Sequence, residues 1–259
     1  MKRAAELFRF EGRSSCSPFI EETWQTRSEP EQFFMSVAVS RWEMVVTRER
    51  GGARLTVRGP ETKATKAPIP QDAEFFGIQF SLATFMPGLP PSRLVDRSLT
   101  LPQATSTSFW LGGSTWELPG PDNADVFVDR LARAGLLVHD PVASAALEGD
   151  VNGLSKRSVE RRVSLATGLT RGVIRQIRRA ERAVELLSQG VSALDVACQA
   201  GYADQAHLTR SLKRFVGQTP SQIATSAARA GSTMATDRSH AARSRPPGGS
   251  FYGTVGRKP

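Results

Sequence analysis

The sequence predicts an α+β protein with a β-rich N-terminal domain and an all-α domain in which a long helix joins two helix-turn-helix units. Three observations support this prediction. Residues 1–120 alternate apolar and polar side chains between frequent prolines, a helical period begins after Pro119-Gly120-Pro121, and one helical segment recurs 49 residues further on. We therefore expect domains at 1–120 and 121–228, and a disordered basic tail at 229–259.

Strands are indicated first, in the segment before residue 120. Gly51-Gly52 lies between the segments 42–48 and 53–58 and is expected to form a hairpin turn. Apolar residues alternate with other types, which is the period of a half-buried strand. The residues that show it are Leu55, Val57, Phe76, Ile78 and Phe80. This segment is therefore expected to form a small β-rich domain.

Helices are indicated from Asp122 onward. Val126, Leu131 and Leu136–Leu137 are expected to mark the first apolar helical face. Helices then continue to about Ala228, after which the chain has little apolar material to bury. The junction at Pro119-Gly120-Pro121 is therefore taken as the domain boundary.

An internal repeat is the most informative feature of the sequence. Residues 155–170 align without gaps on residues 204–219, and each copy carries three apolar residues spaced as i, i+4 and i+7. Gly168 aligns with Gly217, where each can end a helix, and Thr170 aligns with Thr219, where each can cap the next one. The apolar triplets are Val159, Val163 and Ala166, and Leu208, Leu212 and Phe215.

The opposite face of each repeated helix is polar. At about 100° per residue, these side chains lie roughly opposite the apolar stripe. They are Arg157, Glu160 and Arg161 in the first copy, and Ala206, Thr209 and Arg210 in the second. Arginine can bind guanine with two hydrogen bonds, and threonine can contact base edges or phosphates. Two matched copies therefore indicate two helices that read a major groove.

A shorter helix is expected before each repeated helix. Ser192 to Asp195 has the pattern of a capping box, Gly201 suits the turn that follows, and Asp204 can cap the second helix. Residues 142–147 take the equivalent place before Ser155. Each copy thus has the helix, turn and helix of a helix-turn-helix unit.

The segment 171–189 is expected to be one helix between the two units. A helix of that length spans roughly 28 Å, and one turn of DNA is about 34 Å, so one chain could present both units to successive major grooves. The helix carries arginines at 171, 175, 178, 179 and 182. Some are expected to contact phosphates, and others to be solvated or paired with Glu181 and Glu185.

Charge is divided unevenly along the chain. Residues 1–150 carry 16 Lys and Arg against 19 Asp and Glu, whereas residues 151–225 carry 12 against 5. Residues 226–259 add 6 against 1, and the whole chain has a formal charge of +9. This distribution is typical of a polyanion-binding half attached to a half with another role.

These residues resemble a known family. Ser155-Lys-Arg-Ser-Val-Glu-Arg-Arg, Ile177-Arg-Arg-Ala-Glu-Arg-Ala, Val196-Ala-Cys-Gln-Ala-Gly-Tyr and Lys213-Arg-Phe-Val-Gly-Gln-Thr-Pro are similar to the DNA-binding domain of AraC/XylS-type transcription regulators. The resemblance covers about residues 122–226 and implies a seven-helix domain. It also implies an N-terminal region of the cupin-like kind, a small β-barrel that often binds an effector or dimerises.

The resemblance assigns base-facing roles by position. They fall to Arg157, Glu160 and Arg161 in the first reading helix, and to Gln205, Ala206, Thr209 and Arg210 in the second. Two positions depart from the family pattern. Glu160 stands where glutamine is common and would accept from cytosine while repelling phosphate, and Ala206 has no hydrogen-bonding group.

Catalysis has no support in the sequence, so we do not expect an enzyme, a cofactor or a metal. The histidines are His139, His207 and His240, which leaves residues 1–120 without the histidine cluster of a metal-dependent cupin. Cys16 and Cys198 are far apart and are expected to be ordinary small residues in a reducing compartment. No apolar run is long enough to span a bilayer, so we expect no membrane association and a cytoplasmic location.

The expected function is a sequence-specific transcription regulator, with an effector at the N-terminal domain as a further possibility. The expected partner is double-stranded DNA; RNA polymerase, a small-molecule effector and a second copy of this chain, bound through the N-terminal domain, are further candidates. Two alternatives are left open. One is a β-domain small-molecule binder or enzyme with a non-specific nucleic-acid-binding C-terminal half, and the other is non-specific packaging of nucleic acid by the basic tail.

Overall fold

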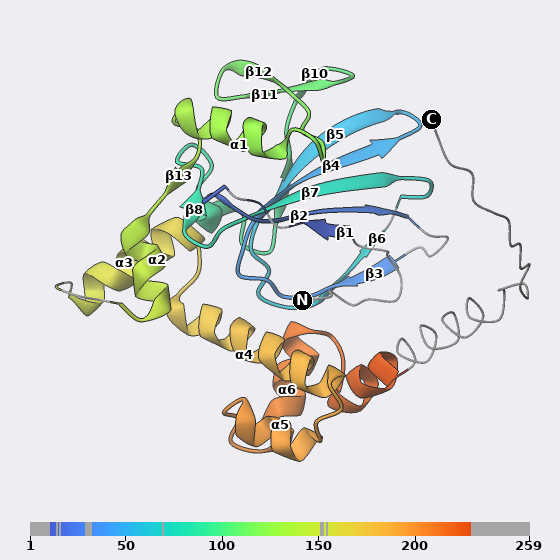
Figure 1. Ribbon diagram of the computed structural model, residues 1–259, viewed down its shortest axis with the longest axis vertical. Coiled ribbons are helices and arrows are strands. Elements are labelled where there is room, and N and C mark those ends of the chain that lie inside the picture. Colours follow the sequence, from blue (N-terminus) through green and yellow to red (C-terminus); the bar gives the residue numbers. More distant parts are fainter. Residues whose placement is uncertain are drawn as a thin grey trace, which may run out of the picture.

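The computed structural model describes residues 11–13, 15, 17–28, 33–68, 70–150, 153 and 155–228. Cys16 and the basic tail expected at 229–259 lie outside these residues. Figure 1 shows a β-rich part and a helical part, with strands from the first half of the chain and a chain of helices along one side. This arrangement is the predicted α+β fold class.

One antiparallel sheet of six strands dominates the β-rich part. Its strand order is β1-β2-β7-β4-β5-β9. The strands are β1 (Glu11–Arg13), β2 (Ile20–Arg27), β7 (Glu74–Phe80), β4 (Glu43–Glu49), β5 (Gly52–Arg58) and β9 (Ser98–Thr100). Glu49 pairs with Gly52 at the end of the β4–β5 ladder, which confirms the hairpin expected at Gly51-Gly52.

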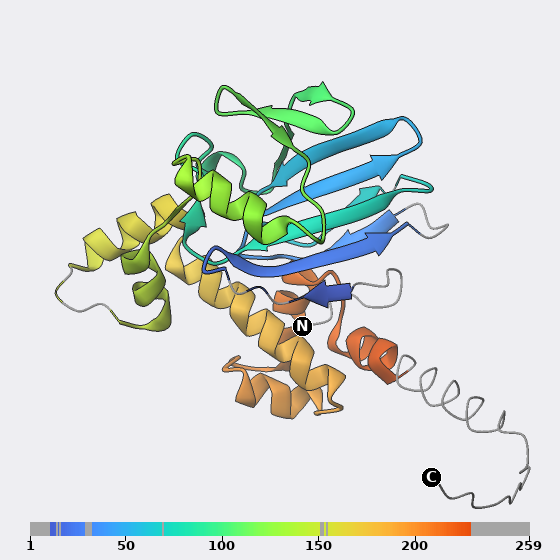
Figure 2. The ribbon, with the colours of Figure 1, turned by 45° about the horizontal axis from the view of Figure 1, so that its top comes forward.

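The two faces of this sheet differ because successive side chains of a strand point to opposite sides. Leu55, Val57 and Ile78 face the first hydrophobic core and are at most 1% exposed. Helix α1 (Ala124–Arg133) packs on this face, and Figure 2 shows it lying across the strands. The other face carries more polar side chains and borders a large cavity.

Short strands complete the β-rich part. β10 (Gln103–Thr105), β11 (Ser108–Leu111) and β12 (Ser114–Glu117) form a three-stranded sheet. β3 (Phe33–Ser36) pairs with β6 (Thr65–Pro68), and β8 (Thr84–Phe85) pairs with β13 (Val138–His139). The single turn η1 (Pro91–Arg93) lies before β9. The β3–β6 pair and η1 matter below because both touch the helical part.

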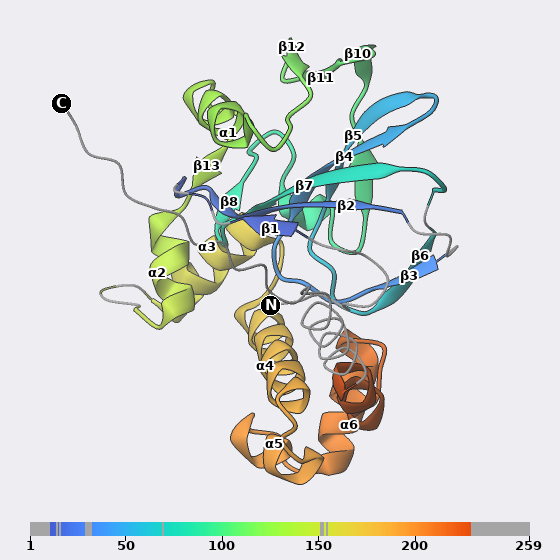
Figure 3. The same cartoon turned by 45° about the vertical axis from the view of Figure 1, so that its right-hand side comes forward.

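The remaining helices follow in sequence order. They are α2 (Pro141–Glu148), α3 (Lys156–Thr167), α4 (Arg171–Ser188), α5 (Ala193–Gln199) and α6 (Gln205–Phe215), and residues 220–228 are also helical. Figure 3 shows α4 running from the α2–α3 pair to the α5–α6 pair. Its 18 residues correspond to roughly 27 Å, close to the expected length.

A second hydrophobic core joins the helices. It contains the buried faces of α3, α4 and α6, and it also includes Ala38 and Ala83 from the β-rich part. Helix α1, in contrast, packs in the first core through Phe127, Val128 and Leu131. The division into 1–120 and 121–228 stays a prediction; by packing, α1 lies with the sheet.

One expected face is wrong in detail. Val126 is 61% exposed, whereas the apolar stripe of α1 consists of Ala124, Phe127, Val128 and Leu131. These four positions follow the i, i+3, i+4, i+7 spacing of a helix, which Val126 does not.

Among the described residues, no helix has the length and apolar character needed to cross a membrane.

Candidate nucleic-acid interface

The two repeated helices begin with the same device. The Ser155 hydroxyl accepts a hydrogen bond from the Ser158 amide at 3.1 Å, and the Asp204 carboxylate accepts one from the His207 amide at 2.6 Å. Such caps satisfy amide groups that have no partner within the first turn of a helix. The structure thus confirms both N-terminal boundaries that the repeat predicts.

The repeated helices also end alike. Gly168 and Gly217 have φ angles of 74° and 77°, in the left-handed region that favours glycine. Beyond each glycine, a threonine starts the next helix. Thr170 accepts from the Val173 amide and Thr219 from the Gln222 amide, each at 3.3 Å. The matched caps and terminal glycines therefore start and end α3 and α6 in the same way.

A shorter helix precedes each of these helices, as predicted. Ser192 caps α5 by accepting from the Asp195 amide at 3.2 Å. Asp140 caps α2 by accepting from the amides of Val142 and Ala143 at 2.9 and 3.0 Å. The Asp140 cap was missed by the sequence analysis, although an aspartate before Pro141 is a recognisable helix start.

The apolar faces of the two helices lie in one core. All six aligned apolar residues are at most 4% exposed. They are Val159, Val163, Ala166, Leu208, Leu212 and Phe215. Burial of this stripe fixes the rotation of each helix about its axis, and it therefore decides which side chains face outward.

The predicted base-facing residues lie on the outer side of their helices. Arg157, Arg161, Gln205, Ala206 and Arg210 are exposed, and the remaining two, Glu160 and Thr209, are half-buried. The Thr209 hydroxyl donates to the Gln205 carbonyl oxygen at 2.9 Å, so in this structure it can only accept from a further group. Within the described part of the chain, the three arginines form no ion pair.

Both repeated helices end against the β-rich part. A β-carbon added at Gly168 would lie 2.7 Å from the Pro91 carbonyl carbon, and one added at Gly217 would lie 2.9 Å from the Met35 sulfur. Neither glycine could therefore carry a side chain without a shift of its neighbour. These contacts could not be predicted from the sequence. A glycine at the end of a helix marks the end of that helix, but it does not identify a contact partner more than 70 residues away.

Two hydrogen bonds reinforce the contact at the second unit. The Ala38 amide donates to the Phe215 carbonyl oxygen at 2.7 Å, and the Ala64 amide donates to the Arg214 carbonyl oxygen at 2.8 Å. The last carbonyl groups of a helix have no partner within it. Backbone amides of the β-rich part thus satisfy the C-terminal end of α6.

A cavity of about 1280 Å³ lies on the polar face of the six-stranded sheet. β3 and β6 border it on one side, and Gln218 and Ser226 of the helical part lie at its edge. The Trp24 ring covers part of its floor and lies so close to Gly77 that a β-carbon there would be 2.1 Å from the ring. Gly77 is therefore required for this position of Trp24.

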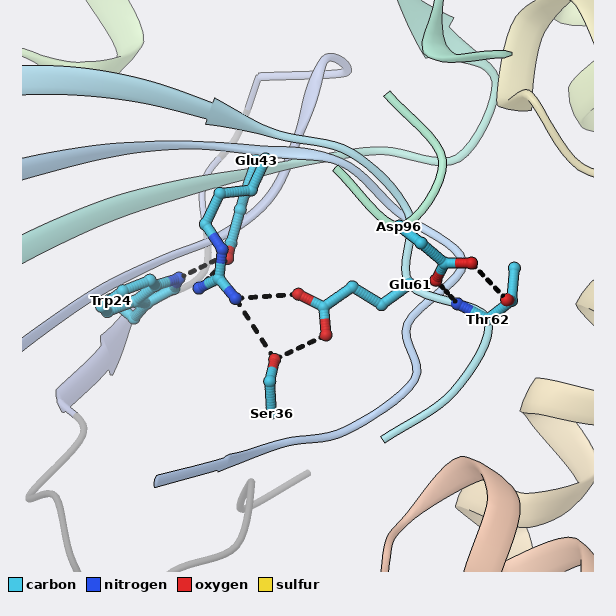
Figure 4. A network of polar contacts seen from close by, with 7 residues as sticks. Trp24, Ser36, Glu43, Glu61, Thr62 and Asp96 are labelled. Carbon is cyan, nitrogen blue, oxygen red and sulfur yellow. Dashed lines mark hydrogen bonds and ion pairs between the residues drawn. The ribbon is translucent and has the colours of Figure 1, made fainter. Parts of the chain in front are cut away.

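A polar network surrounds Arg58 in this cavity (Figure 4). The guanidinium of Arg58 binds Glu43 at 3.2 Å and Glu61 at 2.8 Å. Ser36 donates to Glu61 at 2.6 Å, and the Trp24 indole donates to Glu43 at 3.1 Å. Two carboxylates thus share one guanidinium in this network.

Groups suited to metal binding do not gather in the described residues. No cluster of three or more His, Cys, Asp or Glu that could hold a metal is present among them. His139 is bound through Nδ1 to the Thr84 hydroxyl at 3.0 Å, and Nδ1 of His207 accepts from the Ala203 amide at 3.5 Å. Cys198 is a free, exposed thiol.

Comparison with known proteins gives a family match and a curated relative. Residues 150–226 match the family described as the helix-turn-helix domain. The HTH-type transcriptional regulator RipA of Corynebacterium glutamicum is 32% identical over 123 residues, which cover 42% of this chain and 37% of RipA. The match thus spans little more than a third of the length of that relative.

Solved structures of ToxT from Vibrio cholerae also match. A 1.65 Å structure of ToxT has a TM-score of 0.39 at 10% identity and covers 85% of this chain and 98% of that one. ToxT bound to (E)-4-(8-methylnaphthalen-1-yl)but-3-enoic acid has a TM-score of 0.36 at 10% identity, with 86% and 100% covered.

Proposed function

We propose that the chain is a transcription regulator of the AraC type that binds a specific DNA sequence, because residues 150–226 match a helix-turn-helix family. In this proposal α3 and α6 enter successive major grooves on one face of the duplex. The base-reading residues are Arg157, Glu160 and Arg161 in α3, and Gln205, Ala206, Thr209 and Arg210 in α6.

One observation carries this proposal. A single chain holds two helices with the same cap, the same buried stripe and the same terminal glycine, and each presents a polar outer face. Arg161 and Arg210 occupy equivalent places on these faces and are free to bind an anion or a base. Helix α4 separates the two units by roughly 27 Å, a length suited to placing α3 and α6 in neighbouring major grooves, which are about 34 Å apart.

Selection from random DNA tests the proposal. Purified full-length chain should enrich a site with two conserved blocks about one helical turn apart, and footprinting should show protection in two major grooves on one face. A duplex with both blocks scrambled should bind at least 10³-fold more weakly. Equal affinity for selected and scrambled DNA would instead support the alternative of non-specific nucleic-acid binding.

We further propose that a small molecule in the cavity of the β-rich part controls DNA binding. The cavity has the size of a ligand site, with aromatic and aliphatic walls and a few converging polar groups. Gln218 and Ser226 at its edge belong to the segment that follows α6, so an occupant would touch both parts of the chain. The Arg58 network favours a ligand that donates hydrogen bonds.

The control role is tested without knowing the natural effector. Thr56 lines the cavity, so Thr56→Trp would fill part of it, whereas Thr107→Trp at an exposed position of the same part would not. Thr56→Trp should change affinity for the selected site by about threefold or more and leave base preference unaltered. If both variants bind as the unmodified chain does, the cavity has no part in control.

Dimerisation through the N-terminal domain and contact with RNA polymerase stay predictions. Sedimentation of the full chain at micromolar concentration tests the dimer, and transcription from a template that carries the selected site tests the polymerase contact. Neither result bears on the DNA-binding proposal, because both grooves would be read by one chain.

A further inference from the structure

A cleft of about 380 Å³ lies between α4 and α6 and shares one residue, Arg210, with the predicted base-reading face. We call it the arginine cleft, defined by Arg175 and Arg179 of α4 and by Arg210 and Arg214 of α6. None of the described residues that line it is an Asp or a Glu. It is thus a concave surface on which four cationic side chains meet.

The other arginines of α4 are occupied by protein partners. Arg171 donates to the Ala146 carbonyl oxygen at 3.1 Å, and Arg182 binds Glu185 at 3.2 Å. Arg178 donates at 3.2 Å to a carbonyl oxygen at the end of α2 and is also paired with a glutamate there. These three arginines therefore hold the first unit to α4 or balance a charge on it.

Arg175 and Arg179 differ from these three. Within the described ranges, neither forms an ion pair or a hydrogen bond to a carboxylate. Arg175 is exposed, and Arg179 is half-buried with its guanidinium carbon 5.4 Å from the centre of the Tyr202 ring. Of the five arginines of α4, three thus have partners within the protein and two face the cleft.

Arg210 and Arg214 complete the cleft from the other side. They lie four residues apart and therefore on one flank of α6. The guanidinium carbon of Arg214 is 4.9 Å from the centre of the Phe215 ring. Stacking on an aromatic face holds a guanidinium in place without neutralising its charge, so both helices offer positioned cations.

Tyr202 at the base of the cleft supplies no negative charge. Burial raises the pKa of its hydroxyl, against the smaller lowering effects of the hydrogen bond with Ser211 and of Arg179. The hydroxyl therefore stays neutral at physiological pH and pairs with the Ser211 hydroxyl at 3.1 Å. No residue that lines the cleft therefore carries a negative charge.

We propose that the arginine cleft holds a phosphate of the DNA backbone beside the second reading helix. This inference rests on the proposed function, because it requires α6 to enter a major groove. Arg210 belongs both to the predicted reading face and to the cleft, so the strand that borders the groove would pass the cleft opening. Guanidinium groups bind phosphate oxygens with paired hydrogen bonds.

The first unit differs at the equivalent place. On α3 the positions that align with Ser211 and Arg214 are Arg162 and Leu165. Arg162 is paired with Asp140 at 3.2 Å, and Leu165 is 57% exposed. The proposal therefore places this backbone contact at the second half of the DNA site alone.

Substitution of the cleft arginines tests the proposal in the full-length chain. The double variant Arg175→Gln/Arg179→Gln should lose about 10- to 100-fold in affinity at low salt, equally for the selected site and for a scrambled duplex. The slope of log affinity against log salt should fall by about one for each phosphate that the variant no longer binds. Arg182→Gln on the same helix is the matched control and should change affinity less than about twofold.

A second variant keeps every arginine. A β-carbon at Gly172 meets only the Thr170 hydroxyl at 3.7 Å, so Gly172→Glu fits and places a carboxylate at the cleft. It should lower affinity for both duplexes as the double variant does, whereas Gly172→Gln should not. Thermal melting checks that each variant remains folded.

The source of the phosphate is tested by neutral methylphosphonate links, placed one at a time along each strand of the selected site. One position in the second half should weaken binding by the unmodified chain and have no further effect on the double variant. If the double variant keeps the affinity and salt slope of the unmodified chain, the proposal is wrong. It is also wrong if inorganic pyrophosphate binds the unmodified chain through these arginines while the DNA affinity of the variant is unchanged.

These outcomes separate the inference from the proposed function. If the unmodified chain prefers its selected site and the double variant binds it equally well, only the cleft proposal fails. If the unmodified chain shows no preference between selected and scrambled DNA, sequence-specific regulation fails, and the cleft proposal fails with it as stated.

Discussion

The first and second helix-turn-helix units share a scaffold and differ on one flank. In the first unit Arg162 is neutralised by Asp140, and Leu165 lies exposed beside it. In the second unit the aligned positions are Ser211 and Arg214, which border a cleft with three further arginines. The caps, buried stripes and terminal glycines are nevertheless the same in both.

This difference separates two kinds of constraint on a repeated motif. The shared positions determine where each helix begins, ends and turns, so a change there would alter the fold of either unit. The flank does not enter the core and can therefore vary in charge. In the two proposals above, both units read bases and the second also binds the DNA backbone.

Core truncation should have the largest effect on this comparison. Leu212→Ala should lower the free energy of unfolding by about 3 kcal/mol, because Leu212 is fully buried and its truncation leaves a cavity. The aligned Val163→Ala removes one carbon atom fewer and should cost about 2 kcal/mol. Urea unfolding followed by circular dichroism measures both, and a larger destabilisation for Val163→Ala would show that the two buried stripes are not equivalent.

The terminal glycines should give the next largest effect. Gly168→Ala combines a left-handed φ with a clash against the backbone of η1, so we expect a destabilisation of about 3 kcal/mol. Gly190→Ala is the control, since its φ is 85° and its added β-carbon meets nothing within 4 Å. It should cost about 1 kcal/mol. Equal destabilisation in thermal melting would contradict a tight contact between α3 and the β-rich part.

Substitution of the arginines proposed to read bases should have the next largest effect, and this effect is on DNA binding. Arg161→Ala and Arg210→Ala should each reduce the preference for the selected site over a scrambled duplex by about 1–3 kcal/mol. Because Arg210 also borders the arginine cleft, its removal should weaken binding to scrambled DNA as well. Fluorescence anisotropy on both duplexes measures the two effects, and identical behaviour of the two variants would remove the proposed asymmetry.

The ion pair on the first flank should have the smallest effect. Arg162 is half exposed, and exposed pairs contribute little. Arg162→Ala should therefore lower the free energy of unfolding by about 0.5 kcal/mol and leave DNA affinity nearly unchanged. A tenfold decrease in DNA affinity would show that the first unit also contacts the backbone through this flank.

Local features of the helical part could be predicted from the sequence. Ser155, Asp204 and Ser192 cap helices, and Gly168 and Gly217 end them, because a cap or a left-handed turn depends on a few neighbouring residues. The outward rotation of the polar faces followed from the spacing of the apolar stripe. The repeat supplied the remaining evidence, since each copy supports the other.

Contacts between distant segments could not be predicted in the same way. The Arg58 network joins four separate segments, and the arginine cleft depends on how α4 crosses α6. Neither leaves a local pattern. Helix α1 shows a related limit, because the period that identifies a helix does not say which core it joins. Its Phe127 and Val128 pack on the sheet.

The burial of Ala38 and Ala83 in the helical core affects how this chain could be re-engineered. A chimera that replaced the β-rich half with an unrelated sensor would leave gaps where these methyl groups now pack. It would also leave the carbonyl oxygens of Arg214 and Phe215 without their amide partners. A functional exchange of sensor halves should therefore retain the segments around residues 38, 64 and 83, which makes this protein less modular than its two-part sequence pattern implies.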